Sequence, residues 1–152
     1  MTRPIIQINT ATTPMPCSST PPEIPDYLQK VYWWAYLHPN AVRLFEREWL
    51  INLILWGNFR SLRDKALIEL GQPIHGKTLQ IACVYGDFTP TLVSQLAPEA
   101  TLDIVDVAPI QLANLARKLP LDPRIQLHQQ DACHLQSASH HYDHTVLFFL
   151  LH

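Results

Sequence analysis

A glycine and two aspartates are spaced in a way that suits nucleoside binding. Gly86 follows an apolar run and precedes a helical stretch, so backbone N–H groups there would face a carboxylate or phosphate. Asp106 ends the next apolar run, where its carboxylate can accept hydrogen bonds from both ribose hydroxyls. Asp131 and Ala132 follow a third run and could hold an adenine amino group. Since parallel strands end at one edge of a sheet, the spacing predicts a nucleoside cofactor site.

Each of these residues also has a simpler interpretation. Gly86 could form an ordinary turn, Asp106 could cap the helix that Pro109 begins, and Asp131 could be a turn residue. The full G-x-G-x-x-G pattern is absent, because segment 82–87 reads ACVYGD. Without the first glycine a pyrophosphate cannot approach the backbone closely, so a mononucleoside fits better than a dinucleotide.

The elements that would position these residues alternate along the second half of the chain. Apolar runs predict strands at 78–84, 102–107, 125–130 and 145–151. Helices are expected at 89–97, with Thr89 as N-cap and Pro90 as its first residue, and at 109–119. Short apolar strands separated by helices are typical of βαβ units in an α/β fold, with a parallel sheet covered on both faces.

The first half of the chain has a different composition and residue pattern. Residues 1–25 are rich in proline, threonine and serine and predict a mobile leader. Residues 26–72 carry aromatic and aliphatic side chains at helical spacing and predict a helical layer, whose third helix, 62–70, ends at Gly71. The aromatic residues would form its core or, alternatively, a lid over a lipophilic substrate. Residues 73–152 would then form the ligand-binding unit.

Composition excludes several classes of function. The formal net charge of the 152 residues is -2, which gives no electrostatic footprint for nucleic acid. The 3 cysteines show no CxxC spacing and no disulfide framework, so we expect a reducing, cytoplasmic location. The 8 histidines match no known metal-site spacing. We find no signal peptide and no apolar run of the roughly 20 residues that a membrane span needs.

Several segments together resemble one known family. They read YWWAYLHP at 32–39, FEREWL at 45–50, VYGDFT at 84–89, DVAPIQL at 106–112 and FFLLH at 148–152. The combination resembles the rhodoquinone biosynthesis methyltransferase family over residues 26–152. The resemblance implies a Rossmann-like class I methyltransferase fold that binds S-adenosylmethionine and converts ubiquinone to rhodoquinone, with a ring methoxy group replaced by an amino group. It also implies that S-adenosylmethionine donates the amine and that a divalent metal such as manganese assists.

The resemblance also suggests roles for individual residues. Val84, Tyr85 and Gly86 would line the methionine end of the cofactor. Asp106 would hold its ribose, and Asp131 with Ala132 its adenine. Asp87 is the candidate for holding the metal or orienting the donor amine, since hard cations prefer carboxylate oxygen, although a carboxylate there would also suit a helix start. Asp87 and Tyr85 are the catalytic candidates. The complete cofactor-binding set that we expect is Ala82, Cys83, Val84, Tyr85, Gly86, Asp106, Val107, Asp131, Ala132 and Phe148.

The end of the chain leads to a further expectation. In the implied fold the chain supplies sheet strands in the order 3-2-1-4, and the apolar run 146–151 would need neighbours beyond it. We therefore expect an inactive fragment of a longer enzyme. The resemblance implies that the substrate is a lipophilic quinone, and with such a substrate we expect peripheral contact with a membrane.

Two rival interpretations remain open. The first is a conventional S-adenosylmethionine-dependent methyltransferase acting on a quinone or another small molecule. The second is a non-catalytic module that binds a membrane surface or a partner through the apolar region around Trp33, Trp34 and Trp56.

Overall fold

A four-stranded parallel sheet forms the centre of the described part of the chain. The computed structural model describes residues 56–137 and 140–148. The strands are β1 (Lys77–Ile81), β2 (Thr101–Asp106), β3 (Ile125–Gln129) and β4 (His144–Leu147). They pair in the order β3-β2-β1-β4, all parallel. The predicted α/β class and the strand order 3-2-1-4 are therefore confirmed.

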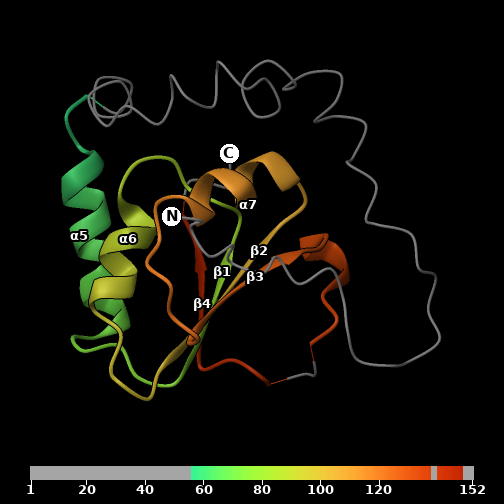
Figure 1. Cartoon of the computed structure of the whole chain (residues 1–152). Coiled ribbons are helices and arrows are strands. Elements are labelled where there is room, and N and C mark those ends of the chain that lie inside the picture. The colour runs from blue at the N-terminus through green and yellow to red at the C-terminus, as the bar shows by residue number, and fades with distance from the viewer. Residues whose placement is uncertain (1–55, 138–139, 149–152) are drawn as a thin grey trace, which may run out of the picture.

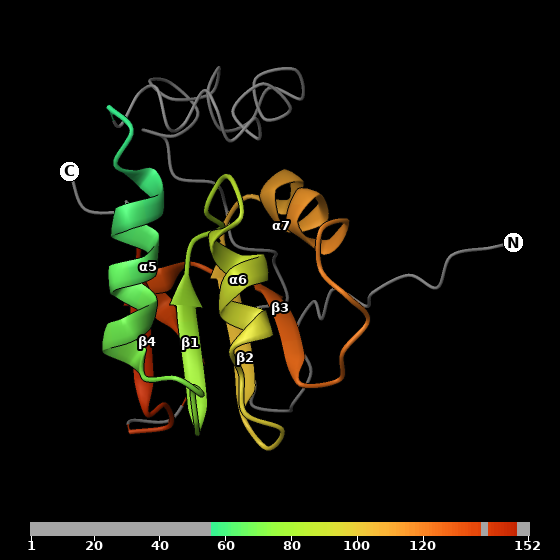
Figure 2. The same cartoon turned by 90° about the vertical axis from the view of Figure 1, so that its left-hand side faces the viewer.

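Helices connect and flank these strands. They are α5 (Phe59–Leu70), α6 (Phe88–Ser94), α7 (Pro109–Ala116) and the short 3-10 helix η1 (Ala132–His134). Helices α5 and α6 lie on one side of the sheet, and the segment that follows β3 runs along the other side (Figures 1 and 2). The predicted leader, most of the predicted helical layer and the closing residues 149–152 lie outside the described residues.

One row of side chains across the sheet faces the helices. Gln80 of β1 is in register with Ile104 of β2 and Val146 of β4, and Ile104 is in register with Leu127 of β3. All four side chains are buried. Because side chains alternate along a strand, this row points to one face, and the bond from Gln80 to α6 identifies that face. The row joins the helices in a single core, whose helical members include Phe59, Leu67, Phe88 and Leu92.

The opposite face carries a polar cluster. Asp103 in β2 lies 3.3 Å from His128 Nε2 and accepts a 2.8 Å hydrogen bond from the Tyr142 hydroxyl. Burial alone would raise the pKa of Asp103, but these two hydrogen bonds outweigh it and lower the pKa. Burial and the same carboxylate raise the pKa of Tyr142 to about 12. The cluster fastens the chain just before β4 to the middle of the sheet.

Several predicted boundaries were wrong for local reasons. Strand β1 ends at Ile81 and not at position 84, because Ala82 has φ 68 and turns the chain out of the sheet. Thr89 is not the N-cap of α6; Asp87 is, and the hydroxyl of Thr89 is bonded inside the core. Helix α6 ends before position 97, because the N–H of Ala97 donates instead to Ile74.

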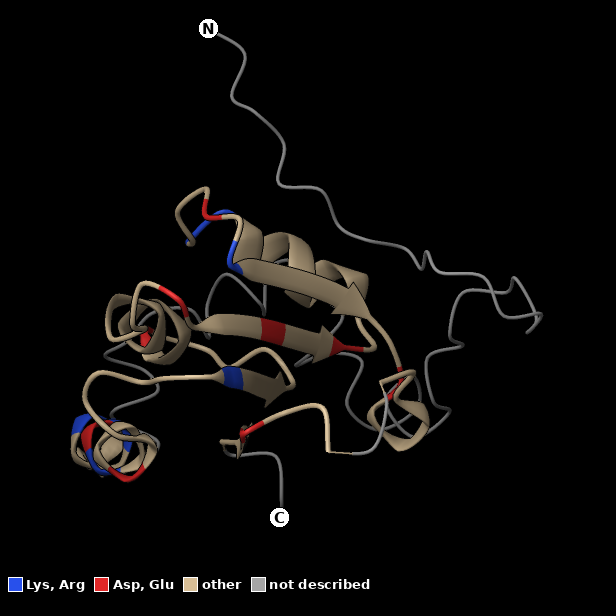
Figure 3. Cartoon of the chain, turned by 90° about the horizontal axis from the view of Figure 1, so that it is seen from below, with Lys and Arg blue, Asp and Glu red and all other residues tan. Residues whose placement is uncertain are grey.

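Charged residues of both signs are spread over the part of the chain that the structure describes (Figure 3). Basic and acidic residues are mixed around α5, and the strands carry few charges (Figure 3). Among the residues that the structure describes, no helix is long and apolar enough to cross a bilayer.

Candidate functional site

The turn after β1 is shaped by hydrogen bonds to the neighbouring strand. The N–H of Ala82 donates to the carbonyl of Val105 at 2.8 Å, and the N–H of Cys83 donates to Asp106 Oδ2 at 2.7 Å. At the far end of the turn Gly86 has φ +80, and a Cβ there would lie 3.1 Å from Cζ of Phe59. Both the backbone conformation and the approach of the ring therefore require glycine.

Asp106 lies where the turn meets the start of α7. Its Oδ1 accepts a 2.8 Å hydrogen bond from the N–H of Ala108, the N-cap residue of α7, while Oδ2 accepts from Cys83. Burial raises the pKa of Asp106, although these backbone N–H groups oppose the increase. A carboxylate offers about four lone-pair sites, and the N–H of Val107 and the thiol of Cys83 also bond this carboxyl. A ligand hydroxyl would therefore share an oxygen of Asp106 with donors of the protein.

Helix α7 and its continuation hold the other side of the turn. Gln111 Nε2 donates to the hydroxyl of Tyr85 at 2.8 Å, and Lys118 Nζ donates to the carbonyl of Gly86 at 3.0 Å. Gln111 is buried and Lys118 is half-buried, so both bonds are shielded from water. The turn is therefore fixed by β2 on one side and by the α7 region on the other.

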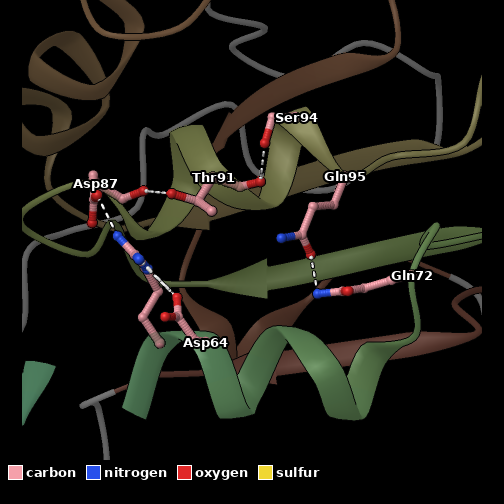
Figure 4. Close-up of polar contacts among 7 residues, drawn as sticks. Asp64, Gln72, Asp87, Thr91, Ser94 and Gln95 are labelled. Carbon is pink, nitrogen blue, oxygen red and sulfur yellow. Dashed lines mark hydrogen bonds and ion pairs between the residues drawn. The ribbon is translucent and has the colours of Figure 1, made fainter. Parts of the chain in front are cut away.

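Asp87, the residue predicted to hold a metal, is instead paired with an arginine. Arg63 of α5 donates to Oδ2 of Asp87 and also to Asp64 Oδ1 at 2.8 Å, so Asp64 and Asp87 lie on facing elements (Figure 4). Oδ1 of Asp87 is buried and has no hydrogen-bond partner. A cation would be repelled by the guanidinium. Over residues 56–137 and 140–148 no group of three His, Cys, Asp or Glu side chains could hold a metal, so these residues do not fit the expected ion.

Asp131 forms a separate, local structure. Its carboxylate accepts a 2.9 Å hydrogen bond from the N–H of Cys133 and lies 3.1 Å from His134 Nδ1, which makes it the N-cap of η1. The bond from the Cys133 backbone is the main reason that the pKa of Asp131 is lowered. Ala132 is exposed beside it. The adenine-binding role of this pair stays a prediction.

The remaining predicted residues fall into two groups. Val107 lies at the edge with Asp106, and its carbonyl accepts from Gln129 Nε2 at 3.5 Å, which links the ends of β2 and β3. Phe148 is partly buried; its ring stacks on Phe88 with centroids 4.2 Å apart and meets Phe59 edge-on at 6.2 Å. Phe148 therefore supports the core beneath the Gly86 turn.

The structure adds residues that the sequence did not single out. Gln80 and Thr89 are buried polar side chains behind the turn, and Arg63, Gln111 and Lys118 hold it from the helices. A glutamine in the middle of an apolar strand was the one visible signal, since buried amides need partners. Arg63, Gln111 and Lys118 gave no such signal, because similar polar residues are common in helices and turns.

A comparison with protein families finds a match over the second half of the chain. Residues 78–152 match the methyltransferase domain family. The matched segment begins in β1 and includes the Gly86 turn, Asp106 and Asp131. It supports a class I methyltransferase that uses S-adenosylmethionine, in agreement with the Rossmann-like sheet order. No similar curated protein and no similar solved structure was found.

Proposed function

We propose that the chain binds S-adenosylmethionine across the carboxyl ends of β1, β2 and β3. The ribose hydroxyls would donate to Asp106, the methionine end would lie along the turn 83–86, and the adenine would lie near Asp131 and Ala132. The observation that carries this proposal is the position of Asp106. It ends β2 at the carboxyl edge of the sheet and joins the turn through Cys83 and α7 through Ala108.

The residues of this chain would bind and orient the cofactor. S-adenosylmethionine, when bound, supplies an electrophilic methyl group or, in the rhodoquinone enzymes, the amino group. Asp106 would fix the rotation of the nucleoside, because two hydrogen bonds to a vicinal diol define a plane. Tyr85, whose hydroxyl is held by Gln111, would border the reacting end of the cofactor. No step is assigned to a metal, since Asp87 is paired with Arg63.

The proposed substrate is the lipophilic quinone ubiquinone, and the proposed product is rhodoquinone. This proposal rests on the resemblance of segments 32–50, 84–89 and 106–112 to the rhodoquinone family. The first of these segments lies outside the described residues. Trp56, six residues after this segment, is 91% exposed, so its side chain would be accessible to a lipophilic molecule.

A conventional methyltransferase is the second candidate, and the family match favours it. Isotopic labels separate the two reactions. The chain is incubated with ubiquinone and S-adenosylmethionine that carries one label in its methyl group and another in its amino nitrogen, and the quinone products are analysed by mass spectrometry. Nitrogen label in the product supports amination, and methyl label supports methylation.

Binding to liposomes and to S-adenosylmethionine, measured on the same chain, tests the non-catalytic alternative. A chain that binds liposomes but neither binds nor consumes S-adenosylmethionine would overturn the enzyme proposal and support a membrane-surface module.

A further inference from the structure

The side chain of Gln80 is a fully buried polar group behind the turn. It lies in the central strand β1 and is 0% exposed. Its Nε2 donates to the carbonyl of Ala82 at 2.9 Å and lies 3.0 Å from Oγ1 of Thr89, whose hydroxyl donates to Gln80 Oε1 at 3.1 Å. Thr89 in α6 is also 0% exposed. One side chain thus connects the strand, the turn and the helix.

This connection acts on a strained position. Ala82 has φ 68, a left-handed conformation that is unfavourable for a residue with a Cβ. Its N–H is bonded to Val105 and its carbonyl to Gln80, so both backbone polar groups favour the bent conformation. An apolar residue at position 80 would fill the same space and leave the carbonyl of Ala82 without this donor. The amide therefore contributes more to the shape of the turn than to the packing of the core.

We infer that Gln80 and Thr89 are positioning residues for the ligand. They hold the turn 82–87 in the conformation that receives the amino-acid end of S-adenosylmethionine, without touching the ligand. This inference rests on the proposed function. It predicts that loss of the Thr89 hydroxyl lowers the affinity for ligands that reach the turn more than the affinity for ligands that reach only Asp106.

A second buried threonine provides a matched control. Thr78 lies two residues before Gln80, on the same face of β1, and is also 0% exposed. Its hydroxyl has no hydrogen-bond partner in the structure. Replacing Thr78 by valine therefore removes a buried hydroxyl at nearly constant volume without removing a contact to the turn.

The experiment compares Thr89→Val, Thr89→Ser and Thr78→Val by calorimetric titration with two probes. S-adenosylhomocysteine carries the amino-acid end, and adenosine lacks it. A hydrogen bond is worth about 1 kcal/mol. We therefore expect Thr89→Val to lower the affinity for S-adenosylhomocysteine by roughly 5–10-fold and the affinity for adenosine by less than about 2-fold. Thr89→Ser and Thr78→Val should bind both probes as the parent chain does. A Gln80→Met variant should repeat the effect of Thr89→Val.

Two outcomes would overturn the inference. In the first, folded Thr89→Val binds S-adenosylhomocysteine as tightly as the parent chain. In the second, both probes weaken equally, as a purely structural defect would cause.

If no form of the chain binds either probe, the proposed function is contradicted. Hydrogen exchange then still tests whether Thr89 holds the turn. The amide of Cys83, bonded to Asp106, should then exchange roughly 5–10-fold faster in Thr89→Val than in Thr78→Val. Equal exchange in the two variants would show that the turn does not depend on Thr89.

Discussion

The turn after β1 and the turn after β3 lie at the same edge of the sheet but are built differently. The first turn is held by distant residues: Arg63 pairs with Asp87, Asp106 binds Cys83, and Lys118 binds Gly86. In the second turn the carboxylate of Asp131 is bonded within its own short segment. The first turn therefore depends on the tertiary fold, whereas the cap of the second depends on local sequence.

This difference matters for a ligand that spans both turns. The end of the ligand near Gly86 would meet a preorganised surface, which reduces the entropy lost on binding. The end near Asp131 would meet a half-exposed cap that can adjust at small cost. Substitutions at the first turn should therefore have larger effects on stability and binding than substitutions at the second.

The largest effect on stability is expected for Gly86→Ala. The new Cβ would lie 3.1 Å from the ring of Phe59, at φ +80. Strain and overpacking together should lower the free energy of unfolding by about 2–3 kcal/mol, measured by denaturant titration. Gly57→Ala is the matched control, because Gly57 has φ +78 and nothing within 4 Å of a new Cβ. Equal losses in the two variants would contradict the role of the ring contact.

A smaller effect is expected for Arg63→Met. This change keeps most of the apolar stem but leaves the carboxylate of Asp87 without its cation, so stability should fall by about 1–2 kcal/mol. Asp64→Asn serves as the control and should cost less than about 0.5 kcal/mol, since Asp64 is exposed. If Asp64→Asn were the more harmful change in thermal unfolding, the importance of the bond between the two elements would be disproved.

The smallest effect is expected for Asp131→Ala at the second turn. Loss of an N-cap costs about 0.5–1 kcal/mol, and here the cap serves only the short helix η1. Hydrogen exchange should accelerate at Cys133 and His134 and remain unchanged at Cys83. Faster exchange at Cys83 would show that the two turns are coupled, which would contradict the local character of the second turn.

Ionisation of Asp106 gives a prediction with a definite sign. Burial raises its pKa above the usual 3.8, so the folded chain holds this proton more tightly than the unfolded chain. The contribution of Asp106 to stability therefore falls as the pH rises from 3.8 through the raised pKa. Ribose hydroxyls donate to the ionised form, so affinity for S-adenosylmethionine should decrease as the pH is lowered through the same range. Calorimetric titrations of S-adenosylmethionine across that pH range measure the affinity. A constant affinity would exclude ionised Asp106 as the acceptor for the ribose hydroxyls.

The sequence predicted the order of elements well because apolar periodicity reports burial directly. Strands β2 and β3 and the start of α7 at Pro109 were predicted to within one residue. The edge of the sheet was also predictable, since Gly86 and Asp106 follow strands. The bend at Ala82 was not, because a left-handed alanine is stabilised by bonds to Val105 and Gln80 that no local pattern reveals.

The partners of the site residues were harder to predict. Asp87 looked like a free carboxylate at a helix start, but Arg63, 24 residues earlier, pairs with it once α5 packs beside α6. Phe148 was predicted to contact the cofactor, and that role stays a prediction, but its stacking on Phe88 was not foreseen. Both results depend on tertiary packing, which residue type and spacing do not specify.

The central claim is that Asp106 binds the ribose of S-adenosylmethionine at the carboxyl edge of the sheet. The direct test is calorimetric titration of S-adenosylmethionine into the parent chain, Asp106→Ala and Asp103→Ala, with folding checked by circular dichroism. Asp103 lies in the same strand but binds Tyr142 on the opposite face, so its loss should leave affinity within about 2-fold. We predict saturable binding that Asp106→Ala weakens by about 100-fold or more, since two charge-assisted hydrogen bonds are lost. No binding by the parent chain, or equal binding by Asp106→Ala, would contradict the account.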